Sequence, residues 1–268
     1  MRSGRKMIFV LLEVKDLSVA LLSGESVLEN ISFQVNPGEM LAIVGGSGAG
    51  KTTICKAVMG LLGTTYQASG EVIFRHENLL NLPERKKRSV YGKEICLIMQ
   101  NPMTAFNPSI RVGRQLGKTY SLHYGKIPST EMTQMFSDLL QRLGLDDTER
   151  VLNSYPFALS GGMLQRLMIA AALVCKPSLL VADEATTAID ACNRIGLMRE
   201  LKSFCIDGMS VLFVTHDLRA AAVSDYILVM NRGRLIEQGK AEQILQDPKE
   251  DYTKYLLNAC RLERRTAI

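Results

Sequence analysis

A glycine-rich run near the start of the chain carries a lysine and a threonine at a spacing suited to binding phosphate. Residues Gly45 to Thr52 fit the pattern G-x-x-x-x-G-K-[ST], and they lie between an apolar stretch, 40–44, and an apolar-periodic one, 53–62. A strand that leads through such a turn into a helix directs backbone N–H groups and the positive helix end at one point. The expected phosphate-contacting residues are Gly45, Gly46, Ser47, Gly48, Ala49, Gly50, Lys51, Thr52 and Thr53.

Within this loop the two polar side chains have different predicted roles. Lys51 can reach the β- and γ-phosphates of a nucleotide as a mobile point charge, and the Thr52 hydroxyl is placed to bind Mg²⁺. The alternative is an ordinary flexible glycine loop before a helix. The lysine and threonine at the required offsets disfavour that interpretation.

A second segment supplies carboxylates. The continuous apolar run 179–182 is typical of a parallel strand covered on both faces, and it ends in Asp183 and Glu184. Asp183 is expected to hold Mg²⁺ through water, whereas Glu184 would point to the other side and polarise an attacking water. Taken alone, the pair could merely cap the next helix.

Two more buried-strand candidates end in polar side chains. The run 211–215 leads to His216, and a γ-phosphate contact is favoured over a structural histidine because ligands bind at that edge of parallel sheets. The run 95–99 leads to Gln100, whose carbonyl can coordinate Mg²⁺ or a water. All these groups would meet at one sheet edge.

The segment Leu159 to Met163 predicts a second anion-binding helix start. Ser160 is a good N-cap, Gly161 and Gly162 allow close backbone approach, and a helical pattern continues to residue 174. One ATP cannot use both helix starts within one subunit. The two sites therefore indicate that another subunit takes part.

With these motifs the chain resembles the ATP-binding subunit of an ATP-binding cassette (ABC) transporter over nearly its whole length. The resemblance implies that two subunits, as a homodimer or heterodimer, enclose two Mg²⁺-bound ATP molecules. Each ATP would lie between one phosphate loop and the partner's signature segment, here Ser160, Gly161, Gly162, Met163 and Gln165. It also implies a role for the loop containing Asp190, two transmembrane permease subunits and an extracytoplasmic substrate-binding protein.

The implied fold is an α/β P-loop NTPase with a mixed, mainly parallel sheet core, an N-terminal antiparallel β subdomain and an inserted helical subdomain. We expect one ABC ATPase domain over 1–268. Its nucleotide-binding core would comprise 1–100 and 177–268, and its helical subdomain, with the signature, would comprise 101–176.

Composition limits the other classes of function. The net charge of +5 is modest, and no basic stripe interleaved with aromatics is visible, so nucleic acid is not an expected partner. No apolar run approaches the length that spans a bilayer. The expected location is therefore peripheral, on the cytoplasmic face of the cell membrane, through the permease partners.

The cargo is predicted from resemblance alone. Residues 98–102, 105–108 and 155–166 resemble the peptide and nickel importer branch. Within it Gly46, Leu164 and the short C-terminus are most similar to the ATPase of nickel importers. Nickel, free or chelated, is the first expectation, oligopeptides or dipeptides the second. A non-transport ABC ATPase, acting in DNA repair or translation, and a non-hydrolysing regulatory cassette stay open.

One departure from the family concerns adenine. Family members usually carry an aromatic side chain near positions 20–22 that stacks on the base, and this chain has Ala20, Leu21 and Leu22 there. The leucines would offer apolar contact without the ring-on-ring term, which is worth about 0.5–1.5 kcal/mol.

Overall fold

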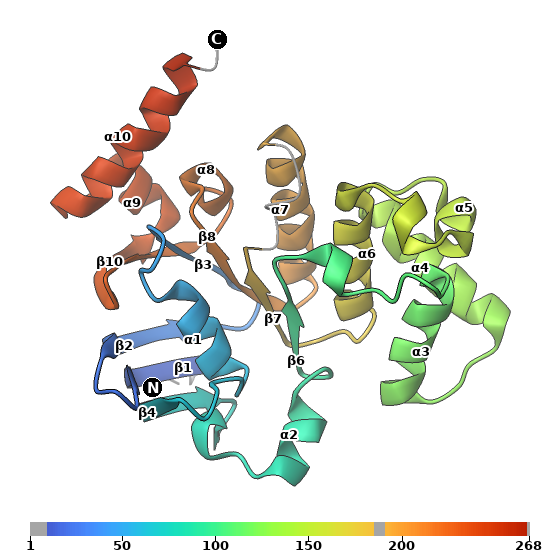
Figure 1. The fold of residues 1–268 in the computed structure, drawn as a ribbon. Helices are drawn as coiled ribbons and strands as arrows, with labels where there is room; N and C mark the ends of the chain where they lie inside the picture. The colour runs from blue at the N-terminus through green and yellow to red at the C-terminus, as the bar shows by residue number, and fades with distance from the viewer. Residues whose placement is uncertain (1–9, 185–190, 267–268) are drawn as a thin grey trace, which may run out of the picture.

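The computed structural model describes residues 10–184 and 191–266, and it contains two β-sheets with helices packed around them (Figure 1). The first sheet is antiparallel and has the order β2-β1-β4-β5. Its strands are β1 (Leu12–Leu21), β2 (Ser26–Val35), β4 (Tyr66–Phe74) and β5 (Glu77–Asn78). Alternating buried and exposed side chains along β1 and β2 agree with a sheet covered on one face.

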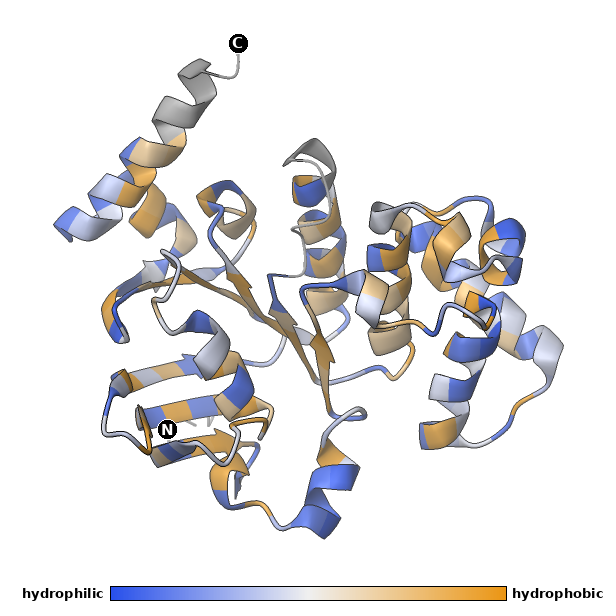
Figure 2. Ribbon diagram, in the orientation of Figure 1, coloured by the Kyte–Doolittle hydropathy of each residue, from blue (hydrophilic) through white to orange (hydrophobic). Residues whose placement is uncertain are grey.

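The second sheet is the centre of the molecule. Its order is β10-β9-β3-β8-β7-β6, and every neighbouring pair is parallel except β9 and β10, which form an antiparallel hairpin. The strands are β3 (Met40–Gly45), β6 (Ile95–Ile98), β7 (Leu179–Asp183), β8 (Ser210–Thr215), β9 (Tyr226–Asn231) and β10 (Arg234–Lys240). The parallel strands are apolar in nearly every residue, as sheets covered on both faces require (Figure 2).

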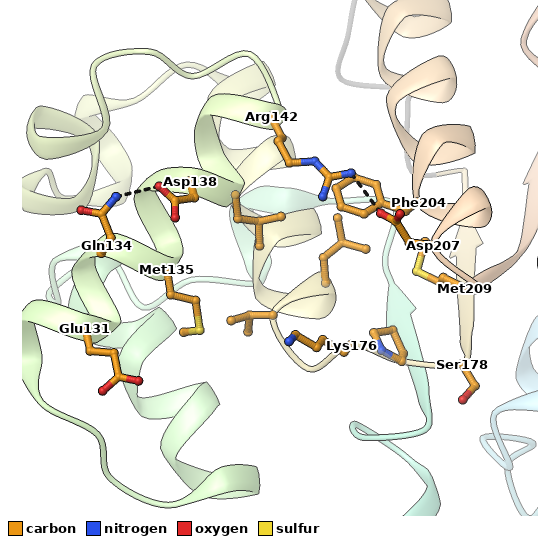
Figure 3. Close-up of a pocket in the computed structure, with 15 residues that line it drawn as sticks. Glu131, Gln134, Met135, Asp138, Arg142, Lys176, Ser178, Phe204, Asp207 and Met209 are labelled. Carbon is orange, nitrogen blue, oxygen red and sulfur yellow. Dashed lines mark hydrogen bonds and ion pairs between the residues drawn. The ribbon is translucent and has the colours of Figure 1, made fainter.

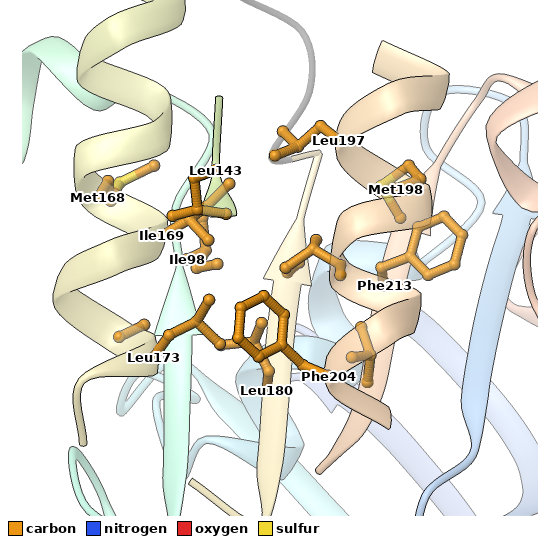
Figure 4. Close-up of a cluster of buried hydrophobic side chains, with 14 of the residues drawn as sticks. Ile98, Leu143, Met168, Ile169, Leu173, Leu180, Leu197, Met198, Phe204 and Phe213 are labelled. Carbon is orange, nitrogen blue, oxygen red and sulfur yellow. The ribbon is translucent and has the colours of Figure 1, made fainter. Parts of the chain in front are cut away.

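The central sheet separates two hydrophobic cores. Because successive strand residues point to opposite faces, Ala42 packs into one core and its neighbours Leu41 and Ile43 into the other. The first core contains side chains of α6 (Gly161–Leu173) and α7 (Ala191–Ile206), such as Ile169 (Figure 4). The second core contains side chains of α1 (Lys51–Val58) and of the antiparallel sheet.

The segment between β6 and β7 is helical. It holds α3 (Val112–Tyr124), α4 (Ser129–Arg142), α5 (Thr148–Asn153), α6 and the short 3₁₀ turns η2 (Pro102–Thr104) and η3 (Pro156–Ala158). The remaining helical elements are η1 (Leu79–Asn81), α2 (Glu84–Val90), α8 (Leu218–Ala221), α9 (Ala241–Gln246) and α10 (Asp251–Thr266). α2 buries no residue, so its basic run is a solvated helix face.

The fold class predicted from the sequence is confirmed: the structure has a mixed, mainly parallel central sheet, an antiparallel N-terminal sheet and an inserted helical part. Within the described ranges, we find no helix that combines the length and the apolar character needed to cross a bilayer.

Candidate nucleotide site

The predicted chemical groups lie along one edge of the central sheet. Strands β3, β8, β7 and β6 are adjacent and parallel, so their carboxyl ends lie side by side. The phosphate loop, His216, the Asp183–Glu184 pair and Gln100 follow these four ends in that order. This is the edge at which open parallel sheets bind ligands.

The backbone of the phosphate loop makes close contacts that require glycine. A Cβ on Gly45 would lie 2.3 Å from the carbonyl oxygen of Met230 on the neighbouring strand. Gly50, the N-cap of α1, has φ of 96°, and a Cβ there would lie 2.5 Å from Leu28. The loop is therefore fixed between β9 and β2, and the amino end of α1 follows it directly.

Lys51 is buried, with 6% of its surface exposed, and its ammonium is held inside the loop. Nζ donates hydrogen bonds to the carbonyl oxygens of Gly45 and Gly46, both at 2.9 Å. Burial lowers the pKa of Lys51, and the nearby carboxylates of Glu184 and Asp183 oppose that shift. The side chain is thus a positive charge inside the loop, where a phosphate group could replace the two carbonyl partners.

The side chains of Thr52 and Asp183 are hydrogen-bonded to each other and together offer oxygen ligands for a metal. The Thr52 hydroxyl donates to Oδ1 of Asp183 at 3.1 Å, although 131 residues separate them. Burial raises the pKa of Asp183, while the Thr52 hydrogen bond and the Lys51 charge oppose the increase. A hydroxyl and a carboxylate side by side are the hard oxygen ligands that Mg²⁺ prefers, so this pair fits the metal.

Glu184 is held in an unusual backbone conformation between two polar side chains. Its φ is 48°, in the left-handed region, and its N–H donates to the carbonyl of Val214 at 3.1 Å. Gln100 Nε2 donates to Glu184 Oε2 at 2.8 Å, and His216 Nδ1 lies 3.7 Å from Oε1. The structure therefore places Gln100 on the carboxylate of Glu184, and not on the Thr52–Asp183 pair.

The signature segment lies in the helical part of the chain. Ser160 is the N-cap of α6, and its hydroxyl accepts the N–H of Met163 at 3.3 Å. In Figure 1, strands β6 and β7 lie between α1 and α6. Gly161, Gly162 and Met163 are partly exposed there, and this helix start is separated from the chain's own phosphate loop by these strands.

Gln165 does not lie where the sequence interpretation put it. Its side chain is fully buried, and neither Oε1 nor Nε2 has a hydrogen-bond partner among the described residues. A helix turns by about 100° per residue, so a position two residues after Met163 faces the interior of the protein. We therefore remove Gln165 from the candidate nucleotide contacts. Asp190 lies outside the described residues.

Two arrangements near the site were missed by the sequence analysis. Asp217, directly after His216, binds Arg194 on α7, with Nη1 and Oδ2 3.0 Å apart. Tyr252, in the first turn of α10, contacts the phosphate loop through its hydroxyl. No local motif marks these residues, because each contact joins segments that are distant in the sequence.

A pocket with a volume of about 890 Å³ lies elsewhere in the molecule. It lies between α4, the end of α6 and the end of α7, and its lining includes Lys176 and Ser178 just before β7 (Figure 3). Arg142 spans it, with its guanidinium over the Phe204 ring at 3.9 Å. The pocket is thus at the amino ends of the strands, opposite the phosphate loop, so pocket size does not locate the chemistry.

Comparison with known proteins agrees with this site. The family model described as "ABC transporter" matches residues 28–187, which include the phosphate loop, Gln100, the signature segment and Glu184. The chain belongs to the ABC transporter family, as an ATP-binding subunit.

Several curated relatives are similar over almost all of this chain. The metal-staphylopine import system ATP-binding protein CntD of Staphylococcus aureus is 38% identical, and the alignment covers 92% of each chain. The oligopeptide transport ATP-binding protein OppD of Salmonella typhimurium is also 38% identical, over 93% of this chain and 76% of that protein. The peptidoglycan transport ATP-binding protein YejF of Agrobacterium fabrum is 41% identical over 93% of this chain, which spans about half (47%) of YejF.

Solved structures share the fold. The ATP-binding cassette MJ0796, solved as a dimer in a post-hydrolysis state with ADP and Pi, superposes with a TM-score of 0.76 at 26% identity. The match covers 86% of this chain and 98% of MJ0796.

Proposed function

We propose that this chain hydrolyses ATP as the cytoplasmic, peripheral subunit of an ABC importer. The observation that carries the proposal is the position of Glu184. Its carboxylate lies between Gln100 and His216, and it directly follows Asp183, which holds the Thr52 hydroxyl. One carboxylate is thus available to activate water, and the other, with Thr52, is available to bind the metal.

The residues divide the work of phosphoryl transfer. Lys51 and the N–H groups at the start of α1 would bind the phosphates, and Thr52 and Asp183 would hold Mg²⁺, which would supply charge neutralisation. Glu184 accepts a proton from the attacking water and orients it. Gln100 fixes one carboxylate oxygen of Glu184, and His216 Nδ1 lies 3.7 Å from the other. His216 has the proposed role of contacting the γ-phosphate.

A complete site requires a second cassette subunit in this proposal. The helix start at Ser160 is exposed and lies away from the chain's own phosphate loop, so it is free to contact a nucleotide bound to a partner. The dimeric form of MJ0796 supports this arrangement. The proposed assembly adds Asp190 at the subunit contact, two transmembrane permeases and an extracytoplasmic substrate-binding protein. The domain division at about residues 100 and 177 is part of this proposal.

For the cargo we propose nickel, free or chelated, with oligopeptides or dipeptides as the second candidate. CntD, named for metal-staphylopine import, supports a chelated metal, and OppD, named for oligopeptide transport, supports peptides. Deletion of this subunit, followed by uptake of radiolabelled nickel and growth on peptides, separates the two. Loss of nickel uptake with normal peptide use supports the first candidate, whereas the opposite pattern supports peptides.

The ATPase proposal is tested with Glu184→Gln, which keeps the shape of the side chain and removes its basicity. We expect ATP affinity to persist and turnover to fall by about 10²- to 10⁴-fold, the usual contribution of a general base. Glu71→Gln, an exposed substitution on β4, is the matched control. Wild-type turnover in the Glu184→Gln dimer would exclude Glu184 as the residue that activates water.

A further inference from the structure

The first turn of α10 reaches the phosphate loop from the far end of the sequence. The Tyr252 hydroxyl accepts a hydrogen bond from the N–H of Gly46 at 3.2 Å, across 206 residues. The match to the family model ends at residue 187, so Tyr252 lies outside the matched segment while Gly46 lies inside it. One backbone amide of the proposed phosphate-binding loop, that of Gly46, is thus already bound by the side chain of Tyr252.

Gly46 is connected on both sides. Its N–H binds Tyr252, and its carbonyl oxygen accepts from Lys51 Nζ at 2.9 Å. The orientation of this one residue therefore affects where the Lys51 ammonium rests. A Cβ at position 46 would lie 3.3 Å from the Tyr252 hydroxyl, which is closer than an ordinary contact. Glycine at this position therefore leaves room for the hydroxyl.

The helix that carries Tyr252 is anchored at its start. The carboxylate of Glu237 on β10 accepts the N–H groups of Lys249 and Glu250, just before α10, at 2.8 and 3.2 Å. Burial alone would raise the pKa of Glu237, but the N–H groups of Lys249 and Glu250 help to hold it below its ordinary value, which favours the charged carboxylate. The Tyr252 ring packs against the first core, and Thr253 is fully buried.

The same region of the chain also holds the other end of the loop. The N–H of Gly233, in the turn between β9 and β10, donates to the carbonyl of Ala49 at 3.1 Å. The phosphate loop is thus fixed at Ala49 by the hairpin turn and at Gly46 by α10. Residues 233–252 act as a brace on the loop.

We propose that Tyr252 is a positioning residue for ATP binding. Its hydroxyl holds the Gly46 peptide in the orientation that the loop needs, and so keeps the loop ready while Lys51 exchanges the Gly46 carbonyl for a phosphate oxygen. The proposal rests on the ATP-binding role of the loop. It assigns a nucleotide-site function to a helix at the opposite end of the chain.

The main test is Tyr252→Phe, which removes only the hydroxyl. We expect the Kd and KM for ATP to rise about threefold to tenfold, as loss of one net hydrogen bond predicts, while kcat stays within about twofold. Tyr255→Phe is the matched control, because that ring lies on the same helix, is exposed and stacks on Tyr252. Unchanged Kd and KM in Tyr252→Phe, with the melting temperature preserved, would overturn the proposal.

A double-mutant cycle with Gly46→Ala separates positioning from general stability. In the wild type the new methyl group meets the Tyr252 hydroxyl and weakens ATP binding, whereas in Tyr252→Phe the obstructing oxygen is gone. The two effects on Kd should therefore be non-additive, by about threefold or more. Additive effects, or a variant that loses melting temperature and kcat with Kd unchanged, would assign Tyr252 a purely structural role.

Equilibrium ATP binding keeps this test independent of the hydrolysis proposal. If the wild type binds ATP without hydrolysing it, the ATPase proposal fails while the Kd comparison still decides the role of Tyr252. If labelled ATP does not bind the wild type at all, both proposals fail. Faster amide hydrogen exchange of the peptide that contains Gly46, in Tyr252→Phe but not in Tyr255→Phe, is the expected direct sign of the lost contact.

Discussion

Arg194 and Asp217 form an ion pair that joins α7 to the residue after His216. Nη1 of Arg194 lies 3.0 Å from Oδ2 of Asp217, and the carboxylate side chain is only 5% exposed. Burial alone would raise the pKa of Asp217, but Arg219 and Arg194 keep it below its ordinary value. The start of α8 and the candidate γ-phosphate contact are therefore tied to a helix that directly follows the loop of Asp190.

The first prediction concerns this pair. Arg194→Met leaves a buried carboxylate with Arg219 as its remaining cationic partner, so we expect the free energy of unfolding to fall by about 1–3 kcal/mol. We also expect kcat to fall, because Asp217 directly follows His216 and its ion pair with Arg194 helps to position that residue. Urea denaturation and steady-state ATPase assays measure the two effects. Arg199→Met, exposed on the same helix, is the control and should change neither.

The second prediction concerns the buried carboxylate of Asp183. Its pKa is raised above 3.8, so its stabilising contribution is complete below pH 3.8 and is lost as the pH rises through the folded-state value. At neutral pH the ionised side chain thus costs stability in the nucleotide-free protein. Asp183→Asn should raise the melting temperature at about pH 7, and this gain should shrink as the pH falls toward 3.8.

The same Asp183→Asn variant should also be stabilised less than the wild type by Mg²⁺ and ATP. We expect the melting temperature of the wild type to rise when Mg²⁺ and ATP are added, by an amount set by the ligand concentration relative to Kd. The asparagine variant should gain little beyond what ATP with EDTA provides. Equal gains in both proteins would show that Asp183 does not hold the metal.

The third prediction compares two lysines of α1. Lys51→Ala removes the buried ammonium that faces the loop carbonyls and should weaken ATP binding severely, by about 100-fold or more, as loss of a charge-assisted phosphate contact predicts. Lys56→Ala removes an exposed charge in the last turn of the same helix and should leave affinity nearly unchanged. Equilibrium binding of labelled ATP is the measurement. Similar affinities for the two variants would mean that the loop has no nucleotide function.

The fourth prediction compares two glycines of the loop. Gly45→Ala drives a Cβ to within 2.3 Å of the Met230 carbonyl, and we expect a loss of about 3 kcal/mol or more in unfolding free energy. Gly48 has φ of 74°, and a Cβ added there would meet no atom within 4 Å, so Gly48→Ala should cost only about 1 kcal/mol of backbone strain. Chemical denaturation of both variants shows which costs more unfolding free energy, the close contact at position 45 or the backbone strain at position 48.

Sequence reasoning located the groups whose positions follow from strand ends. Lys51, Thr52, Asp183, Glu184, Gln100 and His216 each end or closely follow a buried strand, and parallel pairing brings such ends together. The same reasoning could not assign the partner of Gln100, because Asp183 and Glu184 are consecutive in the sequence and only the structure pairs Gln100 with Glu184. The order of the strands was needed for that choice.

Other features depended on tertiary structure that no local pattern encodes. The sequence shows Tyr252 as one more aromatic residue of an amphipathic helix. Tertiary contacts, which include the anchoring of that helix by Glu237 and the packing of the ring on the first core, place it beside Gly46. The prediction that Gln165 contacts the nucleotide was wrong for a related reason. Gln165 lies close to the signature segment in the sequence, but the turn of the helix directs its side chain into the protein interior.

The position of β6 at the end of the central sheet has a mechanical consequence. β6 is four residues long and is hydrogen-bonded to β7 alone among the named strands, and Gln100 follows it by two residues. A movement of the helical part after β6 would therefore be transmitted to the central sheet through this short edge strand. It would change the Gln100–Glu184 contact without breaking the pairing of β7 with β8, the strands that position Asp183 and His216. In this way a movement elsewhere in a complex could control hydrolysis while the central strands stay in place.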